Sequence, residues 1–449
     1  MEPLSLEMVA AVTSGQAPEG AAAVRVTGAV LDSRKAVPGD LFVALPGERA
    51  DGADFGEDAA RRGATAALAV RPVKGLPTVV VDDVRTALAA LGIFCRRAVG
   101  ARVAAVTGSN GKTTVKELLA AMLRPLGSTL ATEGNLNNEL GVPLTLCRLD
   151  AGHRYAVIEM GANHAGEIYR LARWAVPDVG VVTQAAPAHL EGFGSLDGVA
   201  RAKGELFEAL PEDGVAVVNA DDPYAPLWRQ MAGDRRVVTF GAAEDADLAF
   251  RGSGPDLELR WDGTWIAAPS PLPGRHNAAN VAAAAACARV LGADAPTVTA
   301  AVAAATSVPG RLQARIGVGG QRILDDSYNA NPASLEAGLG CLAEMDGERW
   351  LVLGEMAELG SEADVWHRRA ADAARKAGVQ HLWTVGGAAP AAEAFGAGGR
   401  AFDGHGALID ALREALPETA AVLVKGSRAA GMDRVAAALT VESALAPRS

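Results

Sequence analysis

The chain has 449 residues, which is too long for a single hydrophobic core and indicates about three domains. Its formal net charge of −11 at pH 7 argues against nucleic acid as a general partner, because duplex binding requires a basic face. Gly, Ala and Val are frequent and no low-complexity block occurs, so the composition is typical of a globular α/β protein.

The four cysteines lie far apart in the sequence, and none belongs to a C-x-x-C pair. Each lies in an apolar, helix-like context, so we expect buried free thiols rather than disulfides or metal ligands. The first residues lack the basic and hydrophobic regions of a signal peptide, and no apolar run reaches membrane-spanning length. The sequence therefore predicts a cytoplasmic protein. The cysteines are Cys95, Cys147, Cys287 and Cys341.

Residues 1–95 are predicted to form a small N-terminal α/β domain. Pro and Gly turns separate its short strand candidates, and no metal-binding or nucleophilic cluster occurs in the segment. The strand candidates are 24–31, 41–45, 66–70 and 78–81.

A phosphate-binding loop opens the central domain, which we expect over residues 96–309. The apolar strand 103–107 is followed by Gly-Ser-Asn-Gly, and Lys-Thr-Thr then begins a stretch that favours a helix. Glycines let backbone N–H groups approach an anion, the lysine reaches the terminal phosphates, and a hydroxyl meets Mg²⁺. The common spacing would place a glycine at Val106, so this is a shortened variant, and an ordinary βα turn is the alternative. The loop residues predicted to bind nucleotide are Gly108, Ser109, Asn110, Gly111, Lys112, Thr113 and Thr114.

Three side chains after the loop are candidates for metal binding. Glu159 ends the apolar strand 156–160, where a carboxylate is well placed to hold the Mg²⁺ of a nucleotide, although such a residue is often only a solvated rim residue. His189 follows the strand 180–183 and could be a ligand of a second divalent ion, although lone histidines are more often structural. Lys203, fourteen residues later, would ordinarily be an exposed helix residue.

Further strands at 216–219 and 237–240 complete a largely parallel central sheet, and an alanine-rich helix follows. Asn277 and Asn280 lie three residues apart at the start of this helix, so both amides could project from its first turn. An amide donates to and accepts from the edge of adenine, whereas the alternative for Asn277 is a helix N-cap.

In the segment 310–449 strands and helices again alternate, and we predict that it forms a C-terminal Rossmann-like domain. Its strands are expected at 322–325, 350–353, 381–385 and 421–424, with Gly354, Gly386 and Gly426 after three of them. Arg311 at the boundary could reach a phosphate, and a carboxylate after the first strand commonly meets a ribose hydroxyl. Ordinary turn chemistry is the alternative for the two adjacent aspartates.

The motifs occur in one order along nearly the whole chain, and together they resemble the Mur ligases, ATP-dependent peptide ligases of bacterial cell-wall synthesis. The matching segments are TGSNGKTT, NLNNELGVP, VIEMGANHAGEI, AHLEGFGS, AKGEL, PGRHNAAN, LDDSYNANP, LGEMAELG and KGSRAAGM. The N-terminal Leu-Asp-Ser-Arg and Pro-Gly-Asp-Leu-Phe segments are similar to the UDP-binding domain of this family. The segment LDDSYNANP stands where the tripeptide-forming members carry a different sequence, which separates this chain from them.

The resemblance implies specific roles for the candidate residues. Lys112 would bind the ATP phosphates, Thr113 and Glu159 one Mg²⁺, and His189 with a carbamylated Lys203 a second. Asn280 would contact adenine, Arg311 the phosphates and Asp326 the ribose. The remaining expected substrate-binding residues are Ser33, Arg34, Ser427 and Arg428. The loop 132–143 also offers Asn135, Asn137 and Asn138 to a polar substrate, although such clusters also simply form loops.

The resemblance also implies the reaction. The substrates would be UDP-N-acetylmuramoyl-tripeptide and D-alanyl-D-alanine, joined through an acyl phosphate by a monomeric enzyme that uses ATP and two Mg²⁺ ions. The alternatives are another ligase of the same superfamily, such as a folylpolyglutamate synthase-like enzyme, and a P-loop regulatory ATPase. A regulatory ATPase would hydrolyse ATP without forming an amide and would not need the set Glu159, His189 and Lys203.

Overall fold

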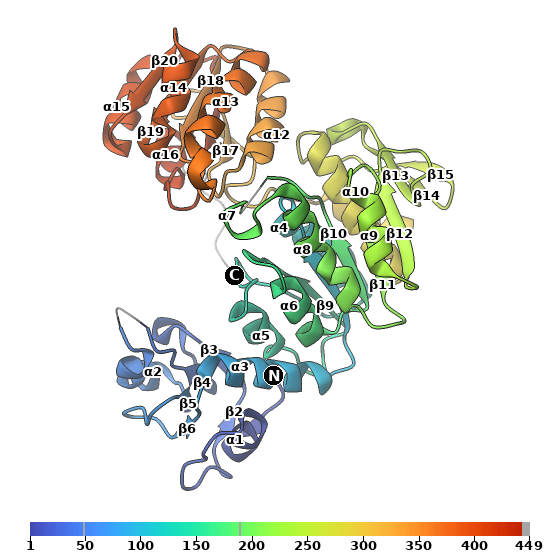
Figure 1. Ribbon diagram of the computed structural model, residues 1–449, viewed down its shortest axis with the longest axis vertical. Helices are drawn as coiled ribbons and strands as arrows, with labels where there is room; N and C mark the ends of the chain where they lie inside the picture. Colours follow the sequence, from blue (N-terminus) through green and yellow to red (C-terminus); the bar gives the residue numbers. More distant parts are fainter. Residues whose placement is uncertain (48–49, 188–189, 442–449) are drawn as a thin grey trace.

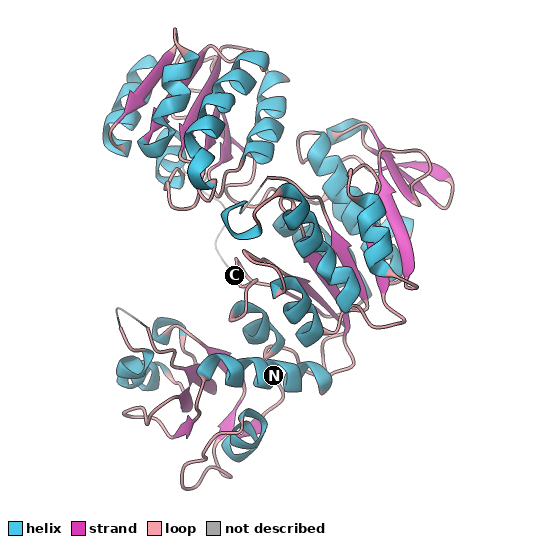
Figure 2. Cartoon of the chain, in the orientation of Figure 1, coloured by secondary structure: helices cyan, strands magenta, loops and turns pink. Residues whose placement is uncertain are grey.

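The computed structural model describes residues 1–47, 50–187 and 190–441, which form three α/β units in chain order (Figure 1). In Figure 2 the magenta strands of the central and C-terminal units lie between layers of cyan helices. The predicted fold class, a three-part α/β protein with largely parallel sheets, is confirmed. Among the described residues, no helix combines the length and the apolar character needed to cross a membrane. The four cysteines are buried and free, as expected.

The N-terminal unit is built on a four-stranded parallel sheet in the order β3-β4-β5-β6. The single strand expected over 24–31 is wrong, because its two halves pair with different neighbours. The first half joins β1 in a separate antiparallel pair, and the second joins β4. The elements are β1 (Leu4–Ser5), α1 (Leu6–Thr13), β2 (Arg25–Val26), β3 (Gly28–Val30), β4 (Asp40–Val43), α2 (Gly56–Arg62), β5 (Ala66–Ala69), β6 (Thr78–Val80) and α3 (Val84–Arg97).

The central unit has a nine-stranded sheet in the order β15-β14-β13-β12-β11-β10-β7-β9-β8. Its strands are parallel from β8 to β13, and β14 and β15 add an antiparallel extension that the sequence did not predict. The elements are β7 (Arg102–Thr107), α4 (Lys112–Leu123), β8 (Thr129–Ala131), α5 (Gly141–Leu146), β9 (Tyr155–Glu159), α6 (Glu167–Ala175), β10 (Val179–Val182), α7 (Leu190–Phe193), α8 (Leu196–Ala209), β11 (Val215–Asn219), α9 (Ala225–Ala232), β12 (Arg236–Gly241), β13 (Leu248–Arg251), β14 (Glu258–Trp261), β15 (Thr264–Ala267), α10 (Arg275–Val290) and α11 (Ala295–Ala303).

Apolar layers cover both faces of this central sheet. Successive strand residues point to opposite faces, so Ala104 and Val106 of β7 join one core cluster with α4 and α10, whereas Val103 and Ala105 join the other with α6 and α8. The near-continuous apolar strands are therefore typical of a parallel sheet that is buried on both sides. This burial leaves the carboxyl ends of the strands as the place for polar chemistry.

The C-terminal unit has a six-stranded sheet in the order β16-β17-β21-β18-β19-β20. The four expected strands form its parallel centre, whereas the edge strands β16, which is antiparallel, and β20 were missed. The elements are β16 (Gln313–Ile316), β17 (Arg322–Asp326), α12 (Pro332–Ala343), β18 (Arg349–Gly354), α13 (Ala363–Lys376), β19 (His381–Val385), α14 (Ala389–Phe395), β20 (Gly399–Phe402), α15 (His405–Ala415), β21 (Ala421–Lys425) and α16 (Asp433–Leu439). Domain boundaries at residues 95 and 309 stay predictions.

Candidate active site

The predicted phosphate loop lies between β7 and α4, and glycines shape it at both ends. Gly108 has φ +140° and Gly111 has φ +82°, in the region that favours glycine. A Cβ at Gly108 would collide with the side chain of Thr183, and a Cβ at Gly111 would collide with the amide of Asn280. The loop therefore packs closely against the end of β10 and the first turns of α10.

Two polar residues fix this loop to the segment after β10. The Ser109 hydroxyl donates to the carbonyl of Ala186 at 3.0 Å and accepts from the backbone N–H of the same residue at 3.0 Å. The Thr183 hydroxyl donates to the Asn110 carbonyl at 2.6 Å. These bonds hold the loop backbone in place, so little reorganisation is needed to bind an anion.

The half-buried Lys112 begins α4 and folds back over the loop. Its Nζ donates to the Gly108 carbonyl at 2.7 Å and to the Ser109 carbonyl at 3.3 Å. Burial lowers the pKa of this ammonium to about 8, against a smaller opposing effect of Glu159. An anion bound in the loop would favour the charged form of Lys112, because it would replace the stabilisation by water that burial has removed.

Two clefts meet at this loop. We call the first the nucleotide cleft, which lies between the phosphate loop, the start of α10 and the carboxyl ends of β17 and β21. We call the second the peptide cleft, a space of about 540 Å³ between β9, α6, α8 and the C-terminal unit. Lys112 and Arg311 line both clefts, so these two cations lie where the clefts join.

Asparagine amides at the start of α10 line the far part of the nucleotide cleft. Asn280 Nδ2 donates to Asn277 Oδ1 at 3.1 Å, and Asn277 Nδ2 donates to the Pro273 carbonyl at 2.8 Å. Asn277 is buried and holds its neighbour, and the helix N-cap is Gly274, so the N-cap alternative for Asn277 is wrong. Asn280 keeps its Oδ1 beside the loop, where the amide could reach a base edge.

The C-terminal unit supplies the opposite wall of the nucleotide cleft. Asp326 ends β17, accepts from the Leu312 backbone N–H at 3.2 Å and pairs with the fully buried Lys425 at the end of β21. Burial raises the pKa of Asp326 and lowers the pKa of Lys425, and each charge partly offsets the shift of the other. The pair fixes the carboxylate where a ribose hydroxyl could donate to it.

Arg311 lies at the junction between the central and C-terminal units. Its guanidinium stacks over the Tyr328 ring, with 4.2 Å from Cζ to the ring centroid. Its Nε is buried and has no hydrogen-bond partner among the described residues. Such a donor is costly to leave unpaired, which favours an anionic ligand at this position.

Glu159 ends β9 at the inner end of the peptide cleft and is only 2% exposed. Its Oε1 accepts from Asn137 Nδ2 at 2.8 Å, whereas its Oε2 is buried without a hydrogen-bond partner in the described part of the chain. A buried carboxylate oxygen with a free lone pair fits a Mg²⁺ ligand. The alternative interpretation of Glu159 as a solvated residue at the rim of the sheet is therefore wrong.

Lys203 lies on α8 and is 2% exposed, so the ordinary interpretation as a surface lysine is wrong. Its Nζ reaches the Ala162 carbonyl at 3.4 Å and stands 5.1 Å from the centroid of the Phe193 ring. Burial and the repulsion of Lys112 lower the pKa of this amine to about 7. Lys203, Lys112 and Glu159 all line the peptide cleft.

Not all predicted metal ligands come together. His189 lies outside the described residues. Thr113 lines a third cleft together with Lys116 and Arg311, whereas Thr114 faces the nucleotide cleft. Within residues 1–47, 50–187 and 190–441, no group of three His, Cys, Asp or Glu side chains could hold a metal ion. The described carboxylate that fits an ion is therefore Glu159.

The predicted substrate-binding residues divide between two places. Asn135, Asn137 and Asn138 line the peptide cleft on one side, and Ser427 and Arg428 line it on the other.

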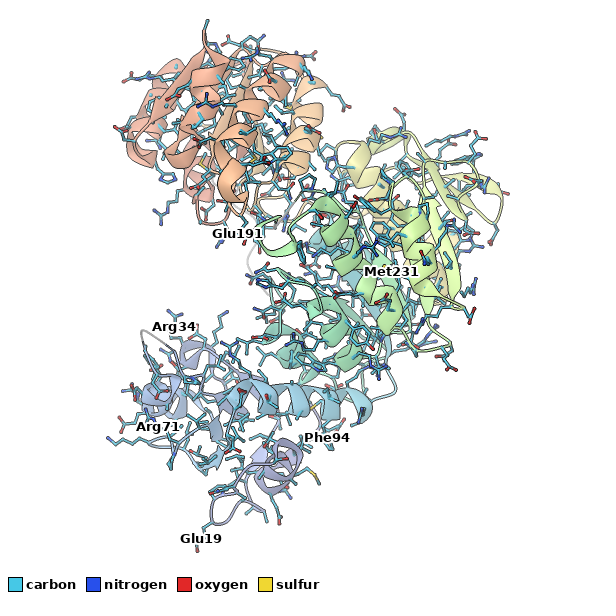
Figure 3. All side chains as sticks on the ribbon, viewed as in Figure 1. Glu19, Arg34, Arg71, Phe94, Glu191 and Met231 are labelled. Carbon is cyan, nitrogen blue, oxygen red and sulfur yellow. The ribbon has the colours of Figure 1, made fainter. Side chains whose placement is uncertain are left out.

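Ser33 and Arg34 lie apart from both clefts, in the N-terminal unit, where Figure 3 labels Arg34. Ser33 Oγ donates to Asp58 Oδ2 at 3.0 Å, and Arg34 forms an ion pair with Asp32 at 2.8 Å. A ligand that contacts these two residues and the peptide cleft must therefore be long.

Several residues of the nucleotide cleft were missed by sequence reasoning, among them Asn331, Lys425 and His276. Asn331 Nδ2 donates to Asn110 Oδ1 at 2.8 Å across the two units, and the same side chain caps α12. Lys425 ends a strand where a buried charge has no sequence signal. His276, beside the predicted Asn277, also lines the cleft.

Comparison with known proteins identifies the family. A model of the Mur ligase family catalytic domain matches residues 25–93, the Mur ligase middle domain matches 106–288, and the Mur ligase glutamate ligase domain matches 310–428. The chain belongs to the Mur ligase family. It is accordingly an ATP-dependent ligase, and the predicted resemblance is confirmed.

Individual relatives match over nearly the whole length. The chain is 45% identical over 417 residues to the UDP-N-acetylmuramoyl-tripeptide–D-alanyl-D-alanine ligase of Escherichia coli K12, covering 91% of this chain and 92% of that protein. A structure of the UDP-N-acetylmuramoylalanyl-D-glutamyl-2,6-diaminopimelate–D-alanyl-D-alanyl ligase from Acinetobacter baumannii is 32% identical, has a TM-score of 0.84 and covers 97% of this chain and 98% of its own. A Thermotoga maritima MurF structure in complex with ADP is 29% identical, with a TM-score of 0.80 and coverage of 92% and 97%.

Proposed function

We propose that this Mur ligase joins D-alanyl-D-alanine to UDP-N-acetylmuramoyl-tripeptide with cleavage of ATP to ADP and phosphate. The observation that carries the proposal is that Lys112 and Arg311 line both clefts. A γ-phosphate held by these two cations would face the peptide cleft, where a carboxylate could attack it. The name of the 45% identical Escherichia coli relative supports the choice of substrates.

The chemistry follows from the charges. An oxygen of the terminal carboxylate of the tripeptide would attack the γ-phosphorus, the bond from phosphorus to ADP would break, and an acyl phosphate would form. The amine of D-alanyl-D-alanine would then attack the acyl carbon, and phosphate would leave. Because carboxylate and phosphate anions must approach each other, Lys112 and Arg311 would act mainly by offsetting negative charge.

Magnesium fits the inner end of the peptide cleft. Glu159, with its unpartnered buried oxygen, would hold one ion, and we propose Thr113 as its further ligand and His189 and Lys203 as ligands of a second ion. When bound, Mg²⁺ would offset phosphate charge and polarise the phosphoryl oxygens.

We also propose that Lys203 is carbamylated. Carbamate forms from a neutral amine and CO₂, and a pKa of about 7 leaves much of this amine neutral at physiological pH. The carbamate would place an anion near Glu159 and Lys112 without altering the backbone. It would replace a buried amine whose hydrogen bond within the described part of the chain is a long one, at 3.4 Å to the Ala162 carbonyl.

The rest of the proposal concerns organisation. We propose domains at 1–95, 96–309 and 310–449, with Ser33 and Arg34 in the first binding the UDP part of the substrate. Asn280 would contact adenine and Asp326 the ribose. We also propose that the enzyme is a monomer. Dependence on ATP and a nucleotide-linked precursor supports a cytoplasmic location.

The decisive experiment incubates the protein with ATP, Mg²⁺, D-alanyl-D-alanine and a UDP-tripeptide that ends in diaminopimelate or lysine. Phosphate release and product mass are measured. ATP consumption should require the UDP-tripeptide and rise sharply when the dipeptide is added. Equal ATP turnover without either substrate would favour a regulatory ATPase, and turnover only with a folate would favour a folylpolyglutamate synthase-like ligase.

A further inference from the structure

Arg170 lies on α6 and lines the peptide cleft, yet the protein makes little use of its guanidinium. Its side chain is 52% exposed, and its ion pair is with Glu139 Oε2 at 3.9 Å. No hydrogen bond from this guanidinium to a described side chain or carbonyl accompanies that pair. An exposed pair of this length is weak, so an anionic ligand could replace it at little cost.

Glu139 shows which end of the cleft Arg170 occupies. Its Oε1 accepts from Arg85 Nη1 at 2.8 Å, and Arg85 lies on α3 in the N-terminal unit. The end of the cleft beside Glu139 is therefore the end next to the N-terminal unit. Because Arg85 already compensates the charge of Glu139, this carboxylate would repel a second anion beside Arg170 only weakly.

The other cations of the peptide cleft lie at other places in it. Lys112 and Arg311 lie at the junction with the nucleotide cleft, and Lys203 is buried. Arg428 stands on the wall formed by the C-terminal unit, 3.7 Å from Asp433. Arg170 thus offers its planar set of donors, which matches a carboxylate in two-point geometry, on the opposite wall.

We propose that Arg170 binds the free carboxylate of the glutamyl residue in the tripeptide substrate, an inference that rests on the proposed function. In the substrate named for the Acinetobacter relative, the glutamyl residue lies between alanine and diaminopimelate and keeps one carboxylate outside the peptide bonds. A substrate that runs from the N-terminal unit to the junction of the clefts presents this residue before its reacting end. The glutamyl carboxylate therefore passes the position of Arg170.

Steady-state kinetics with two substrates test this assignment. One is the UDP-tripeptide, and the other is its analogue with the glutamyl carboxylate converted to an amide. In the unaltered enzyme, amidation should raise KM for the tripeptide by about tenfold or more, as for loss of a charge-assisted hydrogen bond. Arg170→Ala should raise KM for the acid substrate by a similar factor, with kcat nearly unchanged. In this variant, amidation of the substrate should not raise KM further.

Two variants complete the design. Arg170→Lys should recover part of the affinity, because it restores the charge but not the two-point geometry. Arg173→Ala is the matched control, since Arg173 is an exposed arginine on the same helix outside the cleft, and it should behave as the unaltered enzyme. Because Arg170 is half exposed, its replacement should leave the thermal unfolding midpoint nearly unchanged.

Two results would overturn the inference. In one, Arg170→Ala would still distinguish acid from amide as strongly as the unaltered enzyme. In the other, it would lose discrimination between diaminopimelate and lysine tripeptides, which would assign the arginine to a different carboxylate. Failure of the unaltered enzyme to consume either tripeptide would contradict the proposed function itself.

Discussion

The nucleotide cleft and the peptide cleft share Lys112 and Arg311, but they differ in how far the protein has paired their polar groups. In the nucleotide cleft, Asn110 pairs with Asn331 and Asp326 pairs with Lys425. In the peptide cleft, Glu159 Oε2 has no hydrogen-bond partner among the described residues.

Lys203 in the peptide cleft reaches one carbonyl at 3.4 Å. The comparison teaches that the protein itself pairs these polar groups of the nucleotide cleft, whereas Glu159 and Lys203 in the peptide cleft keep bonding capacity that the described residues do not use. Substitutions in the two clefts should therefore change activity, KM and stability in different ways.

The largest effect is expected at the junction. Lys112→Ala should lower turnover by about a hundredfold to a thousandfold, because it removes a preorganised charge between two anions. Phosphate release measures the loss, and thermal unfolding shows whether the fold is retained. A variant that keeps more than about a tenth of the activity would contradict the placement of ATP in this loop. It would also contradict the role of Lys112 as a residue that serves both clefts.

Lys203→Ala tests whether the peptide cleft needs an added anion. We expect activity to fall by about a hundredfold or more, on the scale of one lost charge-stabilising group, and formate or acetate to restore part of it. Crystals of the unaltered, metal-loaded enzyme should show additional electron density beyond the Nζ of Lys203.

The matched control for that experiment is Lys116→Ala. Lys116 is equally buried, but its Nζ donates to the Thr132 carbonyl at 2.7 Å and pairs with Glu117 at 2.7 Å. Its loss should lower stability, and short acids should not repair it. A fully active Lys203→Ala enzyme would refute the carbamate and leave the ligase assignment intact.

Asp326→Asn tests the nucleotide cleft alone. Because the change removes a charge that Lys425 compensates and a proposed acceptor for ribose, KM for ATP should rise by about tenfold to a hundredfold. KM for the UDP-tripeptide should change little. Equal increases in both values would show that the two clefts are not separable.

Asn331→Asp sharpens the comparison at the level of one hydrogen bond. Aspartate can still cap α12 by accepting from the Ser334 N–H, but it cannot donate to Asn110 Oδ1. KM for ATP should rise about twofold to tenfold at nearly constant thermal stability. Asn331→Ala, which removes the cap as well, should lower the unfolding midpoint.

The smallest effect concerns pH. Burial and the nearby Lys425 lower the pKa of His276 from 6.5 to about 4. Between these two values the unfolded chain binds a proton that the folded chain does not, so the free energy of unfolding should fall as the pH falls from 6.5 towards 4. His276→Gln should flatten this part of a stability profile measured by urea unfolding. An unchanged profile would show that His276 contributes little to it.

The sequence by itself determined the fold class, the phosphate loop and most parallel strands, because glycine conformation and runs of buried β-branched residues are local properties. It also placed Glu159 at the end of a strand, where parallel topology concentrates polar groups. The strand 24–31 was misjudged and the strands β8, β13, β14, β15, β16 and β20 were missed, since pairing partners outside the local sequence decide them.

Only the tertiary structure decided which charges are buried and which pairs join the units. Lys203 and Lys425 have the local sequence of ordinary helix and strand residues, yet packing removes both from water and lowers their pKa values. The contact between Asn110 and Asn331 spans 221 residues, and no local pattern encodes it. Desolvation and long-range pairing depend on what surrounds a side chain in space, which is why the division between an organised nucleotide cleft and an incomplete peptide cleft emerged only from the folded chain.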